Sequence, residues 1–317
     1  MKYLITGGAG FIGSHLLDAL ARNADYVVVV DDLSSGSIDN ISKWLSSNNI
    51  TFLKQDLSKT EISPKFLQDC EVVFHLAANP EVRIGSTSPD VHFRQNVLTT
   101  FNVLESVRKA AAVKKFIFAS SSTVYGEAKQ IPTPEEYSPM IPISVYGASK
   151  LACESLISAY ANTYGFQAII ARLANVVGSR SRHGVVYDFI KKLRENPRRL
   201  EILGDGTQSK SYIHISDCID ALLLLLEKAM EKVSIFNVGS EDKVDVKTIA
   251  RIVIEEMGLH DVELYFTGGI DGGRGWIGDV KTMQLDISKI KKLGWIPRFT
   301  SYESIKMAVR DLLKEFP

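Results

Sequence analysis

Neither sign of charge is in excess in this chain. Lys and Arg together number 37 among 317 residues, and Asp and Glu together also number 37. Nucleic acids and anionic membrane surfaces attract proteins with a basic excess, so this balance argues against both kinds of partner. We therefore expect a soluble protein that binds neither nucleic acid nor membrane.

Cysteine is scarce. Cys70, Cys153 and Cys218 lack the spacing of metal ligands, and an odd number of cysteines is a poor basis for a disulfide framework. Free cysteine is among the residue types most often buried. We expect three core thiols in a protein kept in the reducing cytoplasm.

Long hydrophobic runs are also missing. The apolar run at 222–226 is far shorter than the roughly 20 residues of a membrane-spanning helix, and Asp220 and Glu227 flank it. The first residues show no charged segment followed by a cleavable apolar stretch, so we expect no export. There is no internal repeat and no low-complexity segment.

The histidines suggest no metal site. Four of them share no metal-ligand spacing, and we expect each to be structural or to line a pocket. They are His15, His75, His92 and His214.

What the chain does have is an alternation of two patterns. Short apolar runs bounded by turn residues are typical of strands buried on both faces, and they lie at 3–6, 26–30, 51–53, 72–76, 116–119 and 168–173. Helical patterns lie between several of them, at 11–22, 91–110 and 147–164. The alternation predicts an α/β fold with a Rossmann-like, doubly wound parallel sheet.

The pattern changes beyond about Asn175, where stretches richer in Gly, Arg and Pro begin. We assign residues 1–174 to the sheet domain, and residues 175–210 and 233–317 to a smaller C-terminal α/β domain. Residues 211–232 have the pattern of a strand followed by a long apolar helix, and we expect them to return to the first domain.

A glycine-rich loop follows the first expected strand and opens a helix, as a dinucleotide-binding fingerprint requires. Gly7, Gly10 and Gly13 permit a tight turn and the approach of backbone N–H groups to a pyrophosphate; a glycine turn without a ligand is the alternative. Asp31 ends the second strand, where a carboxylate can accept both ribose hydroxyls and repel a 2′-phosphate. NAD is therefore expected in preference to NADP, with Asp32 sharing this role or competing for it.

Asp56 stands at the end of the third expected strand. It is a candidate to bind the adenine amino group. It is equally suited to cap the backbone of Leu57 and Ser58.

Tyr146 and Lys150 stand four residues apart at the head of a helical stretch. Four residues is just over one turn, so the phenol and the ammonium share a face and the cation can favour the phenolate. A free tyrosine, with a pKa of roughly 10, is a poor base at neutral pH. The pair therefore predicts a phenol activated to accept a proton.

Three motifs occur in order: the glycine loop, the segment 120–126, and the pair Tyr146 and Lys150. With them the chain resembles the extended short-chain dehydrogenase/reductase family over nearly its whole length. Within that family it is most similar to the nucleotide-sugar 4-epimerases of the UDP-glucose (UDP-galactose) 4-epimerase group. The resemblance implies NAD in the domain of residues 1–174 and a UDP-hexose in the smaller domain.

The resemblance also assigns roles to individual residues. Tyr146 corresponds to the base, Lys150 to the residue that lowers its pKa and holds the nicotinamide ribose, and Ser121 to the hydroxyl that bonds the reacting sugar oxygen. The expected cofactor contacts are Gly7, Gly10, Phe11, Ile12, Gly13, Asp31, Asp32, Ser35, Gly36, Asp56, Leu57, Leu76, Ala77, Ala78, Asn96, Tyr146 and Lys150. The expected substrate contacts are Ser121, Ser122, Thr123, Asn175, Val185, Lys210, Arg274, Asp279 and Met283.

The segment 120–126 bears on the choice of reaction. Ser120, Ser122 and Thr123 could each instead satisfy local backbone groups, and Thr123 is the expected second sugar contact. Related dehydratases place an Asp-Glu pair, and related decarboxylases a Glu, where this chain has Val124. An apolar side chain cannot transfer a proton, so Val124 favours epimerisation: oxidation at C4, rotation of the 4-keto sugar, and return of hydride to the opposite face.

Around the nucleotide, Asn175 and Arg274 are expected to contact the diphosphate, and Asp279 a ribose hydroxyl. Arg274 is alternatively a surface arginine in a flexible loop. The family usually has an arginine where this chain has Lys210, and lysine lacks the bidentate fork. Met283 stands where the family narrows or opens its sugar pocket; its intermediate size predicts that an N-acetylated hexose is accepted as well.

The resemblance further implies a homodimer formed by the helices at 91–109 and 151–164. Leu151, Leu156, Ile157 and Tyr160 supply an apolar stripe that fits this role. The same stripe could serve the core of the monomer.

Two other interpretations stay open. One is another nucleotide-sugar enzyme of the same fold, namely a decarboxylase, a dehydratase or a 4-ketoreductase. Val124 speaks against the first two, and a bound NAD that does not exchange would speak against the third. The other is a catalytically silent NAD-binding sensor protein; such proteins usually lack the tyrosine and lysine that are present here.

Overall fold

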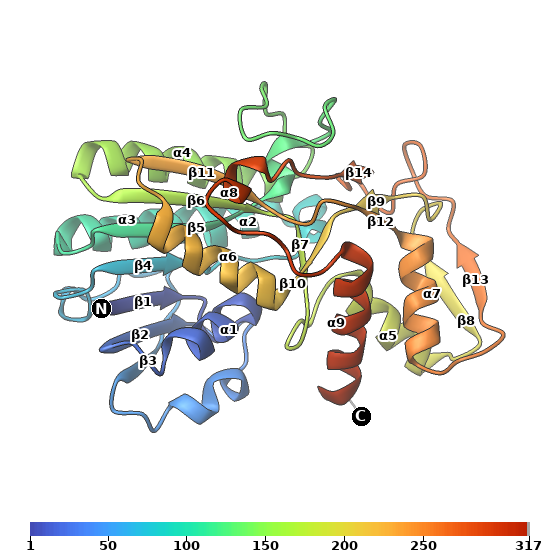
Figure 1. Ribbon diagram of the computed structural model, residues 1–317, viewed down its shortest axis with the longest axis horizontal. Coiled ribbons are helices and arrows are strands. Elements are labelled where there is room, and N and C mark those ends of the chain that lie inside the picture. Colours follow the sequence, from blue (N-terminus) through green and yellow to red (C-terminus); the bar gives the residue numbers. More distant parts are fainter. Residues whose placement is uncertain (316–317) are drawn as a thin grey trace.

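Seven parallel strands form the main sheet of the computed structural model, which describes residues 1–315 (Figure 1). Their order is β11-β6-β5-β4-β1-β2-β3, so the chain winds outward from the centre in both directions. The strands are β1 (Lys2–Thr6), β2 (Tyr26–Asp31), β3 (Ile50–Lys54), β4 (Val72–His75), β5 (Lys115–Ser121), β6 (Gln167–Leu173) and β11 (Val233–Val238). The predicted doubly wound sheet is confirmed.

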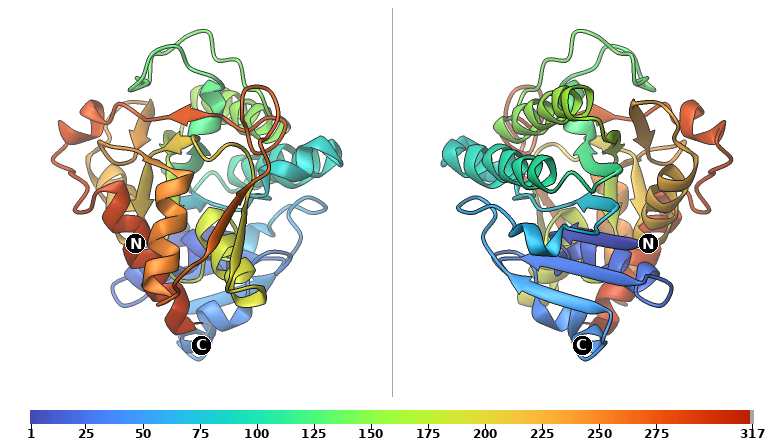
Figure 2. Two further views of the ribbon diagram at one scale, coloured as in Figure 1. Left: turned by 90° about the vertical axis from the view of Figure 1, so that its right-hand side faces the viewer. Right: turned by 90° about the vertical axis from the view of Figure 1, so that its left-hand side faces the viewer.

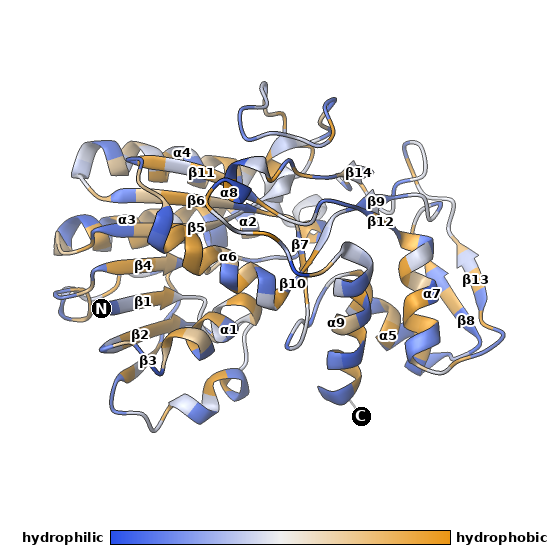
Figure 3. Ribbon diagram, in the orientation of Figure 1, coloured by the Kyte–Doolittle hydropathy of each residue, from blue (hydrophilic) through white to orange (hydrophobic). Residues whose placement is uncertain are grey.

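Both faces of this sheet are buried. Along β2, Val27 and Val29 belong to one hydrophobic cluster, and Val28 and Val30 belong to the cluster on the other face. Helices α1 (Phe11–Leu20) and α6 (Ile215–Lys228) cover the first face, and α3 (Thr99–Ala110) and α4 (Val145–Tyr164) cover the second. Figure 3 shows the strands as largely hydrophobic, which is why the sequence presents them as continuous apolar runs.

The helix expected at 91–110 is interrupted. It consists of α2 (Pro89–His92), the π-helical segment η4 (Phe93–Leu98) and α3. Within η4, Asn96 accepts a hydrogen bond from the backbone N–H of Asn79 (2.8 Å) and donates one to Ser149 (2.9 Å). The wider turn therefore ties the loop after β4 to the first turns of α4. Such π-turns occur frequently at functional sites.

The smaller lobe has a hydrophobic cluster of its own, formed mainly by α5 (Val185–Glu195), α7 (Val246–Glu256) and α9 (Ser301–Glu315). Its short strands are β7 (Asn175–Val177), β8 (Arg199–Ile202), β9 (Ser209–Lys210), β10 (Tyr212–His214), β12 (Val244–Asp245), β13 (Glu263–Phe266) and β14 (Thr282–Met283). The other short elements are α8 (Ser288–Lys291), η1 (Ile38–Trp44), η2 (Pro64–Phe66), η3 (Val82–Ser86) and η5 (Ser122–Tyr125). Both views of Figure 2 show the segment between η5 and α4, in green, projecting from one edge of the molecule.

The boundary between the lobes differs from the one expected. Strand β11 was assigned to the smaller domain, but it pairs with β6 as the edge of the main sheet. Within 211–232, only α6 returns to the main sheet, because β10 pairs with β7 instead. The chain therefore crosses between the two lobes several times (Figure 1).

The expected core thiols are confirmed: Cys70, Cys153 and Cys218 are all buried and unpaired. In the described part of the chain, no helix combines the length and the apolar character needed to cross a membrane. Within the same residues, no group of three or more His, Cys, Asp or Glu side chains could hold a metal ion.

Candidate active site

A cavity of about 470 Å³ lies between the carboxyl ends of the main-sheet strands and the smaller lobe. Gly7 follows β1, Leu76 follows β4, and Ser121 and Leu173 end β5 and β6, and all four line the cavity. Open α/β sheets bind ligands in the crevice outside the carboxyl ends of their strands. The cavity therefore stands where the fold places a ligand.

Most of the expected site residues meet in this one cavity. On the cofactor side they are Gly7, Gly10, Phe11, Ile12, Gly13, Asp31, Asp32, Ser35, Asp56, Leu57, Leu76, Ala77, Ala78, Tyr146 and Lys150. On the substrate side they are Ser121, Ser122, Thr123, Asn175, Val185, Lys210, Asp279 and Met283. Gly36, Asn96 and Arg274 are not among the lining residues. The roles of these residues stay predictions.

The glycine loop is shaped for a close backbone approach. Gly7 has φ +70° and donates its N–H to Val30 (2.8 Å). A Cβ on Gly13 would lie 2.2 Å from the carbonyl oxygen of Gly7, so no other residue fits there without a shift. Gly10, the N-cap of α1, offers no side chain to cap the first N–H groups of the helix. These groups are available to a pyrophosphate, and the loop fits NAD.

Asp31 is held by the backbone on both sides. Its Oδ2 accepts the N–H of Ala9 (2.9 Å) and its Oδ1 accepts the N–H of Leu33 (2.8 Å). Burial raises the pKa of this carboxyl, while the two backbone hydrogen bonds act in the opposite direction. Each oxygen of a carboxylate can accept more than one hydrogen bond, so both remain usable by ribose hydroxyls.

Asp56 shows the backbone-capping alternative. Its Oδ1 accepts hydrogen bonds from the backbone N–H (2.9 Å) and the hydroxyl (2.6 Å) of Ser58, and its Oδ2 pairs with Lys59 (2.8 Å). These contacts hold the pKa of Asp56 below its usual value despite partial burial. Asp56 also lines the cavity, so its capping role does not remove it from the site.

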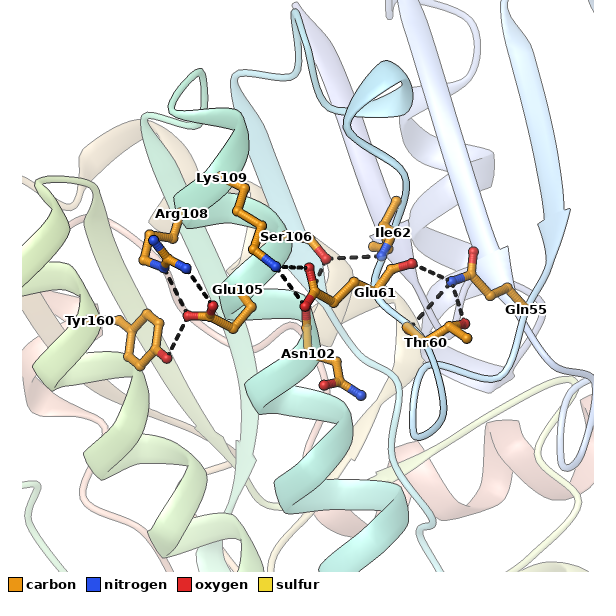
Figure 4. Close-up of polar contacts among 10 residues, drawn as sticks. All are labelled: Gln55, Thr60, Glu61, Ile62, Asn102, Glu105, Ser106, Arg108, Lys109 and Tyr160. Carbon is orange, nitrogen blue, oxygen red and sulfur yellow. Dashed lines mark hydrogen bonds and ion pairs between the residues drawn. The ribbon is translucent and has the colours of Figure 1, made fainter.

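Helix α3 supports the segment that carries Asp56 (Figure 4). Asn102 donates to the carbonyl oxygen of Leu57 (2.8 Å), and Ser106 accepts the backbone N–H of Ile62 (2.9 Å). The position of this cavity wall is therefore fixed from the second face of the sheet.

Tyr146 and Lys150 share a face of α4, as expected, but the pKa of the phenol is not lowered. Lys150 donates its Nζ proton to the carbonyl oxygen of Ala119 (2.9 Å) and lies 5.9 Å from the centre of the Tyr146 ring. Burial raises the pKa of Tyr146 to about 12, outweighing a hydrogen bond with Ser121 that lowers it. Burial also lowers the pKa of Lys150 to about 8. Desolvation therefore dominates the pKa of the phenol among the protein's own groups, and its activation stays a prediction.

Val124 does not face the cavity. It is 0% exposed and lies in the hydrophobic core behind β5, so its apolar character is explained by packing. The residues that line the cavity after Ser121 are Ser122 and Thr123, and Thr123 donates its hydroxyl to the Ser121 Oγ (2.9 Å). The argument against an extra acid or base here therefore rests on these two hydroxyl side chains and not on Val124.

Arg274 is not among the residues that line the cavity. Its Nη2 pairs with Glu127 (2.9 Å), and its Nε donates to the backbone carbonyl of Asp279 (3.0 Å). Lys210 instead lines the cavity and pairs with the Asp279 carboxylate (2.5 Å), which is buried. Arg274 is thus held by partners within its own lobe and by Glu127, and its expected diphosphate contact stays a prediction.

Several cavity residues were not expected. Arg83 comes from η3, and Glu81 is the N-cap of that helix. Asp188 comes from the first turn of α5, and Trp276 from the glycine-rich segment beside Arg274. No motif marks the first three, because they meet only through the packing of the two lobes. Trp276 lies in the same stretch as Arg274 and Asp279, but periodicity cannot tell which side chain of an irregular loop points inward.

The sequence and the fold were compared with those of known proteins, and both match nucleotide-sugar enzymes. The family model for the NAD dependent epimerase/dehydratase family matches residues 3–239. A UDP-glucose 4-epimerase of Mycolicibacterium smegmatis is 31% identical over 315 residues, covering 98% of this chain and 97% of that protein. A crystal structure of a UDP-galactose 4-epimerase is 45% identical, covers 100% of both chains and superposes with a TM-score of 0.86.

Enzymes with another activity are related as well. UDP-glucuronic acid decarboxylase 2 of Arabidopsis thaliana is 29% identical over 320 residues, covering 98% of this chain and 68% of that protein. The relatives thus agree on a nucleotide-sugar enzyme and differ in the reaction. With the glycine loop, the doubly wound sheet and a family match over most of its length, the chain belongs to the NAD dependent epimerase/dehydratase family, and NAD is its cofactor.

Proposed function

We propose that this protein is a UDP-hexose 4-epimerase that interconverts UDP-glucose and UDP-galactose. The observation that carries the proposal is the convergence of Ser121, Tyr146 and Lys150 on the cavity that contains the glycine loop. The two positions after Ser121 on the cavity wall hold hydroxyl groups, which suit hydrogen bonding to a sugar and not elimination or decarboxylation. The similarity to UDP-glucose and UDP-galactose 4-epimerases over nearly the whole chain supports the same choice.

In the proposed reaction, Tyr146 removes the proton from the hexose 4-hydroxyl and later returns one to the same oxygen. Ser121 hydrogen-bonds that oxygen and also the phenol, so it aligns the donor with the acceptor. Bound NAD supplies the hydride acceptor and, once the 4-keto sugar has turned over, the hydride donor. Lys150, buried beneath Tyr146, supplies positive charge when protonated and is placed to hold the nicotinamide ribose.

The pKa values set a condition on this mechanism. With a pKa of about 12, the Tyr146 phenol is a poor proton acceptor at neutral pH. Lys150, with a pKa of about 8, is mostly cationic at pH 7, and the positive nicotinamide ring adds a second charge in the complex. We propose that these two charges together bring the phenol into its working range, and that activity rises with pH up to about pH 8, where Lys150 begins to lose its charge.

The test is to incubate the purified protein with UDP-galactose, without added NAD, and to measure UDP-glucose. We expect interconversion by the wild type and its loss in Tyr146→Phe. Tyr164→Phe is a matched control, because Tyr164 lies on the same helix but is exposed and outside the cavity. The proposal fails if no UDP-hexose is interconverted while Tyr146→Phe behaves as the wild type in every assay.

A decarboxylase is the second candidate, because a decarboxylase relative covers 98% of the chain and because Glu81 and Asp188 place carboxylates on the cavity wall. Incubation with UDP-glucuronic acid and NAD, with release of carbon dioxide as the readout, distinguishes it. Release of carbon dioxide together with no change in UDP-galactose would replace the first proposal by this one.

Met283 bears on the sugar that is accepted. It lines the cavity from β14 and its side chain is almost fully covered. A flexible thioether can make room for an acetamido group, so we propose that UDP-N-acetylhexoses are also substrates. Met283→Tyr should then reduce turnover of UDP-N-acetylgalactosamine more than that of UDP-galactose.

We also propose a cytoplasmic homodimer formed through α3 and α4. Of the apolar stripe considered in the sequence, Ile157 is fully buried in the monomer core. The exposed candidates are instead Phe101 and Tyr164, on either side of Tyr160. Light scattering on the wild type and on Tyr164→Glu tests this: a dimer that the charge weakens supports the proposal, and a wild-type monomer contradicts it.

A further inference from the structure

Trp276 lies near two cations that come from different lobes. The Arg83 guanidinium, on η3, lies 5.7 Å from the centre of an indole ring, and the Lys210 ammonium, on β9, lies 5.5 Å from it. All three side chains line the cavity. An aromatic ring at this distance from a cation is attracted to it electrostatically, so Trp276 connects the two lobes across the site.

The indole N–H is an unused donor. Within the residues that the structure describes, the buried Nε1 of Trp276 has no hydrogen-bond partner. The two neighbouring cations do have partners, since Arg83 binds Glu81 (2.9 Å) and Lys210 binds Asp279 (2.5 Å). A buried donor without an acceptor is costly and uncommon. A ligand that brings an anionic oxygen to this wall would remove that cost.

We propose that Trp276 binds the diphosphate of the substrate, donating its indole N–H to a phosphate oxygen while Lys210 supplies the charge. The inference rests on the proposed function for the identity of the ligand, a nucleoside diphosphate sugar. It assigns to Trp276 the contact that the sequence suggested for Arg274, whose guanidinium is already engaged by Glu127 and by backbone carbonyl groups.

The segment that carries Trp276 is rich in glycine and is packed against its surroundings at defined points. Five glycines between Gly268 and Gly278 have positive φ, and an added Cβ on Gly268 or Gly272 would meet no atom within 4 Å. The end of the segment is anchored, because a Cβ on Gly278 would lie 2.9 Å from the carbonyl oxygen of Ile143, just before α4. Trp276 is thus carried by a glycine-rich segment whose end is packed beside the helix that holds Tyr146.

The experiment compares the binding of UDP and uridine to the wild type, to Trp276→Phe and to Arg274→Gln by calorimetry. Phenylalanine keeps a six-membered aromatic ring near the cations and removes the N–H together with the rest of the pyrrole ring. We expect Trp276→Phe to weaken UDP binding by about tenfold, as for one hydrogen bond to a charged oxygen, and to leave uridine binding unchanged. Arg274→Gln should change UDP binding by less than threefold.

Two further measurements protect the interpretation. Circular dichroism and NAD content show whether Trp276→Phe has folded. The change in tryptophan fluorescence on UDP binding should be lost in Trp276→Phe but kept in Trp44→Phe. Trp44 lies elsewhere, where its indole N–H donates to Asp18 of α1. For an active enzyme, KM for UDP-galactose should rise and kcat should change by less than twofold.

Each outcome has a definite meaning. If Trp276→Phe weakens the binding of UDP and of uridine equally, Trp276 contacts the nucleoside and not the diphosphate. If it weakens neither, Trp276 does not bind the ligand. Either result overturns the inference. If UDP does not bind to the wild type, GDP and dTDP are compared with their nucleosides in the same way, and failure of all three also overturns it. A selective loss of diphosphate binding without any epimerase activity would support the inference and reject the proposed function.

Discussion

Replacing Lys150 with methionine should stabilise the protein while abolishing its activity. Lys150 is 4% exposed, and burial lowers its pKa from 10.5 to about 8. A lysine whose folded-state pKa is depressed destabilises the fold at pH values below both pKa values, and this cost fades as pH rises from about 8 to about 10.5. Methionine has a similar length and no charge, so the cost is absent in the variant.

The magnitude follows from the two pKa values. At about 1.4 kcal/mol per pH unit, the buried ammonium costs about 3 kcal/mol at pH 7 and about 2 kcal/mol at pH 9. The variant leaves the Ala119 carbonyl without its 2.9 Å hydrogen bond, which costs about 1 to 3 kcal/mol at every pH. The free energy of unfolding of Lys150→Met, relative to the wild type, should therefore fall by about 1 kcal/mol between pH 7 and pH 9.

Urea unfolding of both proteins at the two pH values measures this difference. The bound dinucleotide has to be removed first, because a ligand that binds only the folded protein stabilises it by mass action. A difference that stays constant between pH 7 and pH 9 would refute the reasoning, since the loss of a contact is independent of pH and the loss of a titrating group is not. Retention of UDP-galactose epimerisation by Lys150→Met would refute its proposed catalytic role.

Three other substitutions have direct readouts. Glu154→Leu should lower the free energy of unfolding by about 3–5 kcal/mol, because the Arg172 guanidinium, 1% exposed, loses the carboxylate that lies 2.7 Å away. Adding Arg172→Met should recover most of this loss in stability. If the double variant is no more stable than Glu154→Leu, the unpaired buried charge is not the cause. Gly13→Ala should yield folded protein without bound NAD, because the new Cβ would lie 2.2 Å from the carbonyl oxygen of Gly7. The amount of bound NAD is measured as nucleotide released on denaturation. A full complement of NAD would contradict the prediction. Asp31→Asn should shift the ratio of NADP to NAD affinity by about tenfold toward NADP, because the carboxylate that repels a 2′-phosphate is removed. Competition binding measures the ratio. An unchanged ratio would mean that Asp31 does not contact the ribose.

The sequence predicted the sheet and the glycine loop well because local patterns determine them. Strands buried on both faces are continuous apolar runs, and the glycine loop needs residues without Cβ at fixed positions after β1. Tyr146 and Lys150 were placed on one face of a helix by their spacing alone. These features depend on neighbours within a few residues.

The errors arose where the answer depends on distant packing. The sequence cannot show that β11 completes the main sheet, because the strand that pairs with a short apolar run depends on packing between residues far apart in the chain. It likewise could not tell that Val124 points into the core while Thr123 faces the cavity, since η5 breaks the alternation of a strand. The pKa of Tyr146 depends on desolvation by the assembled site, which no spacing reveals.

The late position of β11 has a consequence for synthesis. In the finished sheet Ile170 of β6 pairs with Ile235 of β11, 65 positions further along the chain. While the intervening residues of the smaller lobe are still being made, β6 is an open edge with buried-type side chains and unpaired backbone groups, to which another nascent chain can add. The part of the smaller lobe that lies between β6 and β11 in the sequence must therefore emerge from the ribosome before the nucleotide-binding sheet can close its edge.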